Sequence, residues 1–143
     1  MASRGPPTSR AALIAGDVAA FVAFGLFGLA SHEDAVTQTT FARAILPFPV
    51  AWLLIAPFFG AFSARATEGR YPVANVLMIW AGAGVVAMAG RGLVFDRELF
   101  TAFFAIGITG AGLFLAGWRA MYNWWATRSS RATVEVPAHG KRS

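Results

Sequence analysis

Four long apolar stretches constrain this chain more than any other feature of its sequence. They cover about residues 11–30, 44–62, 73–89 and 99–118. A helix needs about 20 mostly apolar residues to cross the roughly 30 Å hydrocarbon core of a bilayer, because each residue rises about 1.5 Å. Backbone groups in lipid must form hydrogen bonds within their own segment, so helices are the expected form. The sequence therefore predicts an all-α integral membrane protein with four transmembrane helices in an up-down bundle.

The composition supports a lipid environment. Hydrophobic residues make up 57% of the sequence and charged residues 13%, whereas a soluble domain is typically about 45–50% apolar and about 25% charged. A chain of 143 residues is too short to hide that much apolar surface in a water-soluble core. We therefore expect lipid to cover part of it, and we expect the protein in a cell membrane.

The positions of lysine and arginine predict the orientation. One side of the membrane would carry nine of them, in the N-terminal segment, the second loop and the chain end, and the other side only Arg43, Arg91 and Arg97. Basic residues accumulate on the cytoplasmic side, so we expect both termini in the cytoplasm. The predicted layout is a disordered segment at 1–10, a transmembrane domain at 11–125 and a basic disordered tail at 126–143.

The first apolar stretch also has features of a signal peptide. Arg4 and Arg10 precede it, and Gly28-Leu29-Ala30 resembles a cleavage site. Its length and the acidic Asp17 within it favour a retained transmembrane helix. The other three spans keep their orientation under either interpretation.

The sequence lacks the residue types that several kinds of active site require. It has no cysteine and only two histidines, His32 and His139, which the predicted topology places on opposite sides of the membrane. These absences argue against thiolate metal sites, cysteine nucleophiles and two-histidine haem ligation. We also find no nucleophile–base pair. The sequence therefore predicts no catalytic residues, no metal and no cofactor, and its basic residues fit a membrane topology better than nucleic-acid binding.

Asp17 is the most informative single position. An acid within a spanning helix is costly and is treated as a functional-site hypothesis by default. Asp17 lies seven residues past Arg10, and Arg119 ends the fourth span at a comparable depth. Because the first and last helices of a four-helix bundle can be neighbours, we expect an intramembrane ion pair between Asp17 and Arg119. We favour a structural role for it over a proton or cation site or a counter-ion for a ligand, because a single intramembrane acid makes a poor relay.

A polar cluster is expected at the outer end of the bundle. The four residues that would form it lie near the ends of the predicted spans: His32, Arg43, Arg91 and Asp96. A histidine there can titrate near neutral pH. A loop histidine with polar neighbours is the preferred interpretation over a ligand for a pigment or a metal.

Three other residues stand out inside the spans. Pro57 lies within the second span and denies a hydrogen bond to the carbonyl of Leu53, so we expect a helix kink there. Trp52 and Trp80 lie too deep for an interfacial aromatic belt. They either pack the core, which we favour, or line a pocket for a hydrophobic ligand.

Small residues recur at four-residue spacing in the first predicted helix. Ala11, Ala15, Ala19 and Ala23 mark one face. Such faces let helices approach closely in a membrane. They serve either folding within the chain or association with a partner, and the sequence does not separate these two uses.

A set of landmarks follows in a fixed order along the chain. They are Asp17, Ser31-His32, Arg43, Pro47-Phe48, Trp52-Leu53, Arg91-Gly92-Leu93 and Gly117-Trp118-Arg119. In their order and spacing, over roughly residues 11–122, the chain resembles the prokaryotic membrane family called domain of unknown function 3054. The resemblance implies a four-helix multi-pass protein and implies no activity. Pro49 departs from the pattern, where a small or aliphatic residue is expected.

These observations leave three functional hypotheses. The leading one is a non-enzymatic accessory or assembly subunit that acts through helix–helix contacts, as a homo-oligomer or with other membrane subunits. The second is a small transporter or permease that uses Asp17 and Arg119. The third is a binder of a hydrophobic cofactor or lipid through Trp52 and Trp80.

Overall fold

The computed structural model describes residues 9–31, 37–63, 65–68, 70–95 and 102–134, and these residues form helices and the turns between them, with no strand among them. The elements, in chain order, are α1 (Arg10–Ala30), α2 (Gln38–Ile45), α3 (Pro47–Ile55), the 3₁₀ helix η1 (Ala56–Phe59), α4 (Arg65–Glu68), α5 (Pro72–Phe95) and α6 (Ala102–Val134). Within the described chain, four segments are long and apolar enough to cross a membrane: Arg10–Ala30, Gln38–Phe59, Pro72–Phe95 and Phe104–Ser129. The predicted all-helical class is confirmed to that extent.

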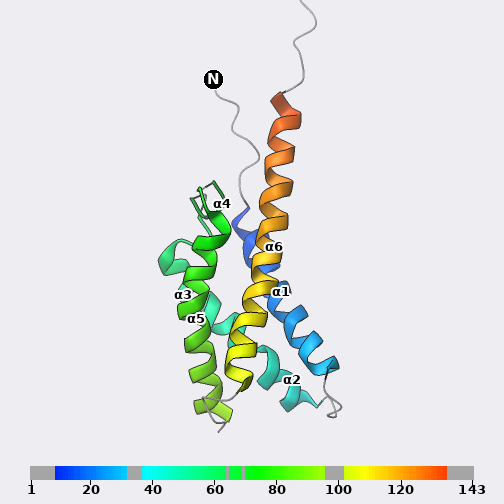
Figure 1. Ribbon diagram of the computed structural model, residues 1–143, viewed down its shortest axis with the longest axis vertical. Helices are drawn as coiled ribbons and strands as arrows, with labels where there is room; N and C mark the ends of the chain where they lie inside the picture. Colours follow the sequence, from blue (N-terminus) through cyan, green and yellow to red (C-terminus); the bar gives the residue numbers. More distant parts are fainter. Residues whose placement is uncertain (1–8, 32–36, 64, 69, 96–101, 135–143) are drawn as a thin grey trace, which may run out of the picture.

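The four long segments run in alternating directions, as the colours in Figure 1 show. Helix α1 packs against α6, α6 against α5, and α5 against α3, while α2 and α3 close the arrangement on α1. The short helix α4 lies at the same end of the bundle as the last turns of α6, and α2 lies at the opposite end. This order brings the first and last long helices side by side.

The second span, predicted at about 44–62, is divided into α2, α3 and η1. It starts at Gln38, where the side chain of Thr37 accepts a hydrogen bond from the Thr40 N–H, and it breaks at Leu46 between α2 and α3. The break has a local cause, because Pro47 and Pro49 have no N–H to donate to the carbonyls one turn earlier.

The predicted kink at Pro57 takes a different form. α-Helical structure ends at Ile55, and Pro57 lies in the first turn of η1, which is followed by Gly60. Pro57 therefore belongs to the end of the span and not to a bend within a continuing helix. A proline is tolerated in a first helical turn, where its missing donor costs little.

Both later spans continue past their predicted ends. Helix α5 begins at Pro72, near the predicted 73, but runs to Phe95 instead of stopping near 89. Helix α6 runs to Val134, so residues 126–134, which were assigned to a disordered tail, are helical. No proline or glycine occurs between Trp118 and Val134 to interrupt α6. The predicted segments at 1–8, 99–101 and 135–143 lie outside the described residues.

Aromatic rings from three helices form the centre of the bundle. Phe21 of α1 contacts both Trp52 of α3 and Trp80 of α5, at ring-centroid distances of 6.2 and 4.8 Å. Phe48 and Trp52 also contact the Trp80 ring. Helix α6 reaches this cluster through Gly112, whose missing side chain leaves room for the Trp80 indole. The favoured interpretation of Trp52 and Trp80 as packed core residues agrees with these contacts.

The outer surface of the bundle is apolar. In an apolar 18-residue stretch of each of the four long segments, only 28–33% of the residues are buried within the chain. Leu54, Met78 and Leu93 are 65%, 76% and 83% exposed, and they come from different helices. A soluble bundle of this size would instead cover its outer face with charged side chains.

Candidate functional site

The candidate site is built on two charged side chains that face each other across the α1–α6 interface. Asp17 lies in the second turn of α1 and Arg119 in the middle of α6. Both side chains are removed from the surface, with 0% of Asp17 and 1% of Arg119 exposed. Isolated charges are very costly at such depth, so each requires a partner.

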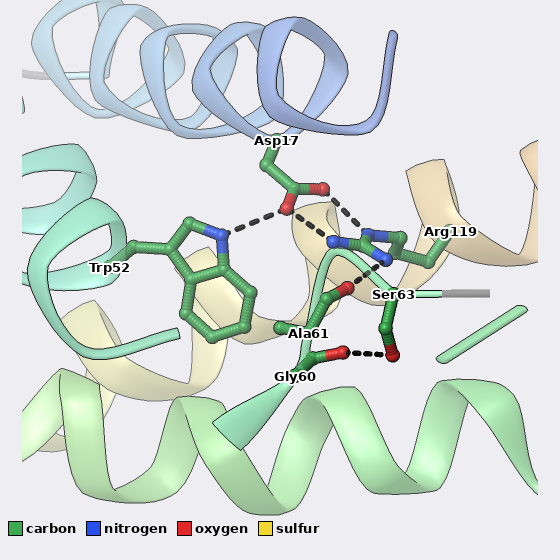
Figure 2. A network of polar contacts seen from close by, with 6 residues as sticks. All are labelled: Asp17, Trp52, Gly60, Ala61, Ser63 and Arg119. Carbon is green, nitrogen blue, oxygen red and sulfur yellow. Dashed lines mark hydrogen bonds and ion pairs between the residues drawn. The ribbon is translucent and has the colours of Figure 1, made fainter. Parts of the chain in front are cut away.

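Asp17 and Arg119 form a two-pronged ion pair (Figure 2). The Arg119 Nε–H donates to Asp17 Oδ1 at 2.7 Å, and the Nη2–H donates to Oδ2 at 2.6 Å. Parallel bonds of this kind match the planar fork of guanidinium to the carboxylate and are the strongest type of side-chain ion pair. The pair that the sequence analysis expected is therefore present in the structure, as a buried contact between the first and last long helices.

Trp52 adds a third hydrogen bond to the carboxylate. Its indole Nε1–H donates to Asp17 Oδ2 at 2.8 Å. The ring reaches this position from α3, where it is fully buried. The contact connects the second span to the ion pair. Sequence reasoning missed it, although a buried indole N–H usually has an acceptor, and that requirement was the available signal.

The remaining side of the guanidinium is held by the main chain. The Nη1–H of Arg119 donates to the carbonyl oxygen of Ala61 at 3.0 Å, and the Phe62 ring lies 5.6 Å from the guanidinium carbon. Nε, Nη1 and Nη2 each have an acceptor, so the arginine makes hydrogen bonds with α1 and with the turn after η1. Nothing in the residue type of Ala61 predicts this role.

The turn at residues 60–63 places the Ala61 carbonyl. Gly60 has a φ of +71°, in the left-handed region that favours glycine. Its N–H bonds to the Pro57 carbonyl, and the Ala61 N–H bonds to the Ala56 carbonyl, which is the Schellman pattern of a helix end. The Ser63 hydroxyl donates to the Gly60 carbonyl at 2.7 Å (Figure 2).

Trp80 uses its polar group in a different way. Its indole Nε1–H donates to the carbonyl of Ile108 in α6 at 2.9 Å. Trp52 and Trp80 are 0% and 2% exposed, and their rings fill the space around each other. Both tryptophans therefore join helices through ring contacts and one hydrogen bond each.

The expected outer polar cluster is described only in part. Arg43 lies in α2 and Arg91 in α5, and both are half-buried. His32 and Asp96 lie outside the described residues. The cluster as a whole stays a prediction.

An open pocket lies beside the turn at residues 60–63. Its volume is about 640 Å³, and Gly60, Ser63, Asn75, Val76 and Ile79 are among the residues that line it. It lies between the end of η1, α4 and the first turns of α5. In the described part of the chain, no group of three or more histidine, aspartate or glutamate residues is placed to hold a metal ion.

Comparison with family models gives one match. The model described as "Protein of unknown function (DUF3054)" matches residues 14–122, which include Asp17, Trp52, the turn at 60–63 and Arg119. No curated protein and no solved structure matches the chain.

Proposed function

The chain belongs to the family described as Protein of unknown function (DUF3054), and since that description assigns no activity, we propose a function from the site and the surface: a non-enzymatic membrane subunit that acts through helix–helix contacts. The family match confirms the resemblance read from the order of landmarks in the sequence. We propose that the protein spans the cell membrane four times, with both ends in the cytoplasm.

The observation that carries this proposal is the outward alanine face of α1, which consists of Ala11, Ala15, Ala19 and Ala23. All four residues are exposed. The close packing of α1 inside the chain uses other positions, such as Gly16, whose missing side chain leaves room for the Trp118 indole. Small residues at four-residue spacing let two helices approach closely in lipid. A face of this kind that the chain does not use itself favours contact with a further transmembrane helix.

The ion pair supports a structural role for Asp17 and Arg119, the two charged residues that are buried in the described part of the chain. Asp17 accepts three hydrogen bonds and the Arg119 guanidinium donates through three nitrogens, all to groups of the chain itself. A proton or ion carrier needs a group that can exchange its partner with water or cargo. The closed network gives the transporter hypothesis less support than the contact hypothesis.

The hypothesis of a hydrophobic cofactor between Trp52 and Trp80 also receives less support. These rings lie 6.1 Å apart at their centroids, and Phe21 and Phe48 fill the neighbouring positions. Cofactor sites are clefts of several hundred cubic ångströms, and the aromatic cluster occupies that space with its own side chains.

The contact proposal is tested by changing the outward alanine face without changing the core. Ala19→Leu adds bulk to an exposed position of α1, and Ala81→Leu adds the same bulk to an exposed position of α5. The full chain, extracted in mild detergent, is expected to run as a homo-oligomer or with a stoichiometric partner. Ala19→Leu is expected to shift it to a monomer, and Ala81→Leu is expected to leave the assembly intact.

The mass of the detergent-extracted protein, measured by light scattering or native mass spectrometry, gives the answer. A wild-type chain that is a monodisperse monomer without a partner would contradict the proposal. An assembly that is equally sensitive to Ala19→Leu and Ala81→Leu would show that the outward alanine face is not the contact.

A further inference from the structure

The turn at 60–63 lies deeper in the bundle than the end of the neighbouring helix α6. The Ala61 carbonyl accepts a hydrogen bond from the Arg119 guanidinium, so the turn lies at the level of the ion pair (Figure 2). From Arg119, α6 continues for five residues to the exposed ring of Trp124, about 7.5 Å at about 1.5 Å per residue. Exposed aromatic rings are typical of the level of the lipid headgroups. In the proposed orientation, the turn therefore lies below the cytoplasmic headgroups.

The backbone of the turn needs hydrogen-bond partners at that depth. Non-helical backbone occurs within a membrane only where protein covers it or where it lines a water-filled cavity. The middle of the turn meets the first condition, because Ala61 and Phe62 are buried. Gly60 and Ser63 are half-buried and line the open pocket. These two residues meet the second condition if the pocket holds water.

The pocket is large, and its lining extends from a loop into the depth of α5. Its volume of about 640 Å³ corresponds to about twenty water molecules at about 30 Å³ each. The lining includes Ala66 of α4, in the loop between the second and third spans. It also includes Ile79, which lies seven residues after the start of α5 at Pro72, about 10 Å along the helix axis. The pocket therefore connects the loop to a level well below the membrane surface.

The lining offers hydrogen bonds that suit water. The Ser63 hydroxyl donates its proton to the Gly60 carbonyl at 2.7 Å, so its oxygen can still accept a hydrogen bond. The side-chain amide of Asn75 has no hydrogen-bond partner among the described residues, and an amide can both donate and accept. A lipid chain in the pocket would leave both groups without a partner, which is costly in hydrocarbon. Water would satisfy both.

We propose that this pocket is a water-filled inlet that opens to the cytoplasm and reaches the level of the buried ion pair. The water contacts Gly60, Ser63 and Asn75. Arg119 is 1% exposed, so the water contacts the turn that holds the guanidinium and not the guanidinium itself. Water at this distance raises the local dielectric constant and lowers the cost of keeping two charges within a membrane. The inference goes beyond the proposed function and rests on its placement and orientation of the chain in the membrane.

Two neighbouring residues of α5 test the inlet. Ile79 lines the pocket, whereas Met78 is 76% exposed on the outer surface of the bundle. The sequence has no cysteine, so Ile79→Cys and Met78→Cys place single thiols at nearly the same depth. Inverted vesicles that contain the full chain are treated with a charged, membrane-impermeant methanethiosulfonate, which reacts with the thiolate. Ile79→Cys is expected to react at least about tenfold faster than Met78→Cys, because a thiol in apolar surroundings is rarely ionised.

A second pair of variants makes the same comparison at the turn. Ser63→Cys exchanges a single atom of a residue that lines the pocket. Phe58→Cys is its control, because Phe58 lies in η1 just before the turn and is 87% exposed. Ser63→Cys is expected to react faster than Phe58→Cys with the same reagent. This pair carries the test if Ile79→Cys does not fold.

Equally slow reaction within each pair would show that lipid chains fill the pocket and would overturn the inlet. Equally fast reaction within each pair would also overturn it, since water would then reach the outer surface of the bundle. Only this second result would contradict the proposed placement in a membrane. Thr127→Cys in the same vesicles reports the orientation, and Ala19→Leu tests the assembly, so neither of these proposals depends on the inlet.

Discussion

The buried pair of Asp17 and Arg119 joins four separate parts of the chain. Their hydrogen-bond partners come from α1, α3, α6 and the turn at 60–63. A buried ion pair can be replaced by apolar residues at little cost, whereas removal of one partner leaves an uncompensated buried charge. Replacement of both residues therefore measures the net contribution of the pair to the free energy of unfolding. Replacement of one residue measures the cost of leaving the other charge buried without a partner.

Asp17→Asn is expected to destabilise the protein by about 3–5 kcal/mol, because Arg119 would stay buried without an anion. The double variant Asp17→Leu/Arg119→Met is expected to recover most of that loss. Unfolding of the detergent-solubilised protein by a graded denaturing detergent measures both. A stable Asp17→Asn protein that loses a transport activity in proteoliposomes would instead favour the transporter hypothesis.

Trp52→Phe tests the indole bond to the carboxylate. Hydrogen bonds to a charged group contribute about 1.5–3 kcal/mol and neutral ones about 0.5–1.5 kcal/mol. Trp80→Phe is the matched control, because it removes the same indole from the same cluster but only a neutral bond to the Ile108 carbonyl. Trp52→Phe is therefore expected to lower the free energy of unfolding more than Trp80→Phe, by about 1 kcal/mol or more. Equal losses in the two variants would show that Trp52 acts through packing alone.

The helices approach each other where a glycine of one faces a ring or branched chain of another. Gly16 of α1 lies under the Trp118 indole of α6, Gly110 of α6 under the Phe24 ring of α1, and Gly25 of α1 against Ile45 of α2. A side chain at any of these positions would have to displace its neighbour. Van der Waals packing of this kind drives the association of transmembrane helices, together with interhelical hydrogen bonds and the entropy of the lipid.

Gly16→Ala is expected to destabilise the α1–α6 contact by about 1–3 kcal/mol, the usual cost of overpacking. Gly28→Ala changes a glycine of the same helix that has nothing within 4 Å of the added carbon. It is expected to be neutral or to stabilise by up to about 1 kcal/mol through helix propensity. The same detergent unfolding assay compares them, and equal effects would contradict the assigned packing.

At the scale of the whole molecule, the four long segments alternate in direction. Residues that are far apart in the sequence therefore meet at the same end of the bundle. The last turns of α6 and the short helix α4 share an end, and α2 lies at the other (Figure 1). Arginine and lysine are in excess at the end that holds α4 and the last turns of α6, and this excess favours a cytoplasmic location for that end. This orientation is part of the proposal and is open to direct measurement.

The sequence has no cysteine, so single cysteines report topology without background. Thr127→Cys in α6 and Gln38→Cys in α2 are exposed and lie at opposite ends of the bundle. A membrane-impermeant maleimide is expected to label Gln38→Cys in intact cells and Thr127→Cys only in inverted vesicles. The reverse pattern would invert the orientation, and labelling of both in intact cells would contradict four spans.

The sequence by itself determined the helical class, the number of long apolar segments and the two charged residues of the core. These follow from local properties: the length of an apolar run, and the high cost of an acid inside it, which requires a cation at similar depth. The residues that match the family could also be recognised in the sequence, because their identity and order are likewise local properties. Helix ends were less well determined at residues 38, 95 and 134, because apolar patterning does not mark where a helix leaves the membrane.

Only the tertiary structure decided which groups complete the ion pair and which faces remain free. The bond from Trp52 depends on the crossing of α1 and α3, and the Ala61 carbonyl is positioned by a turn that any residue type could supply. The outward alanine face and the inward Gly16 differ by a single residue step on one helix. Rotation of a helix about its axis is set by packing against its neighbours, and an almost uniformly apolar sequence does not encode it.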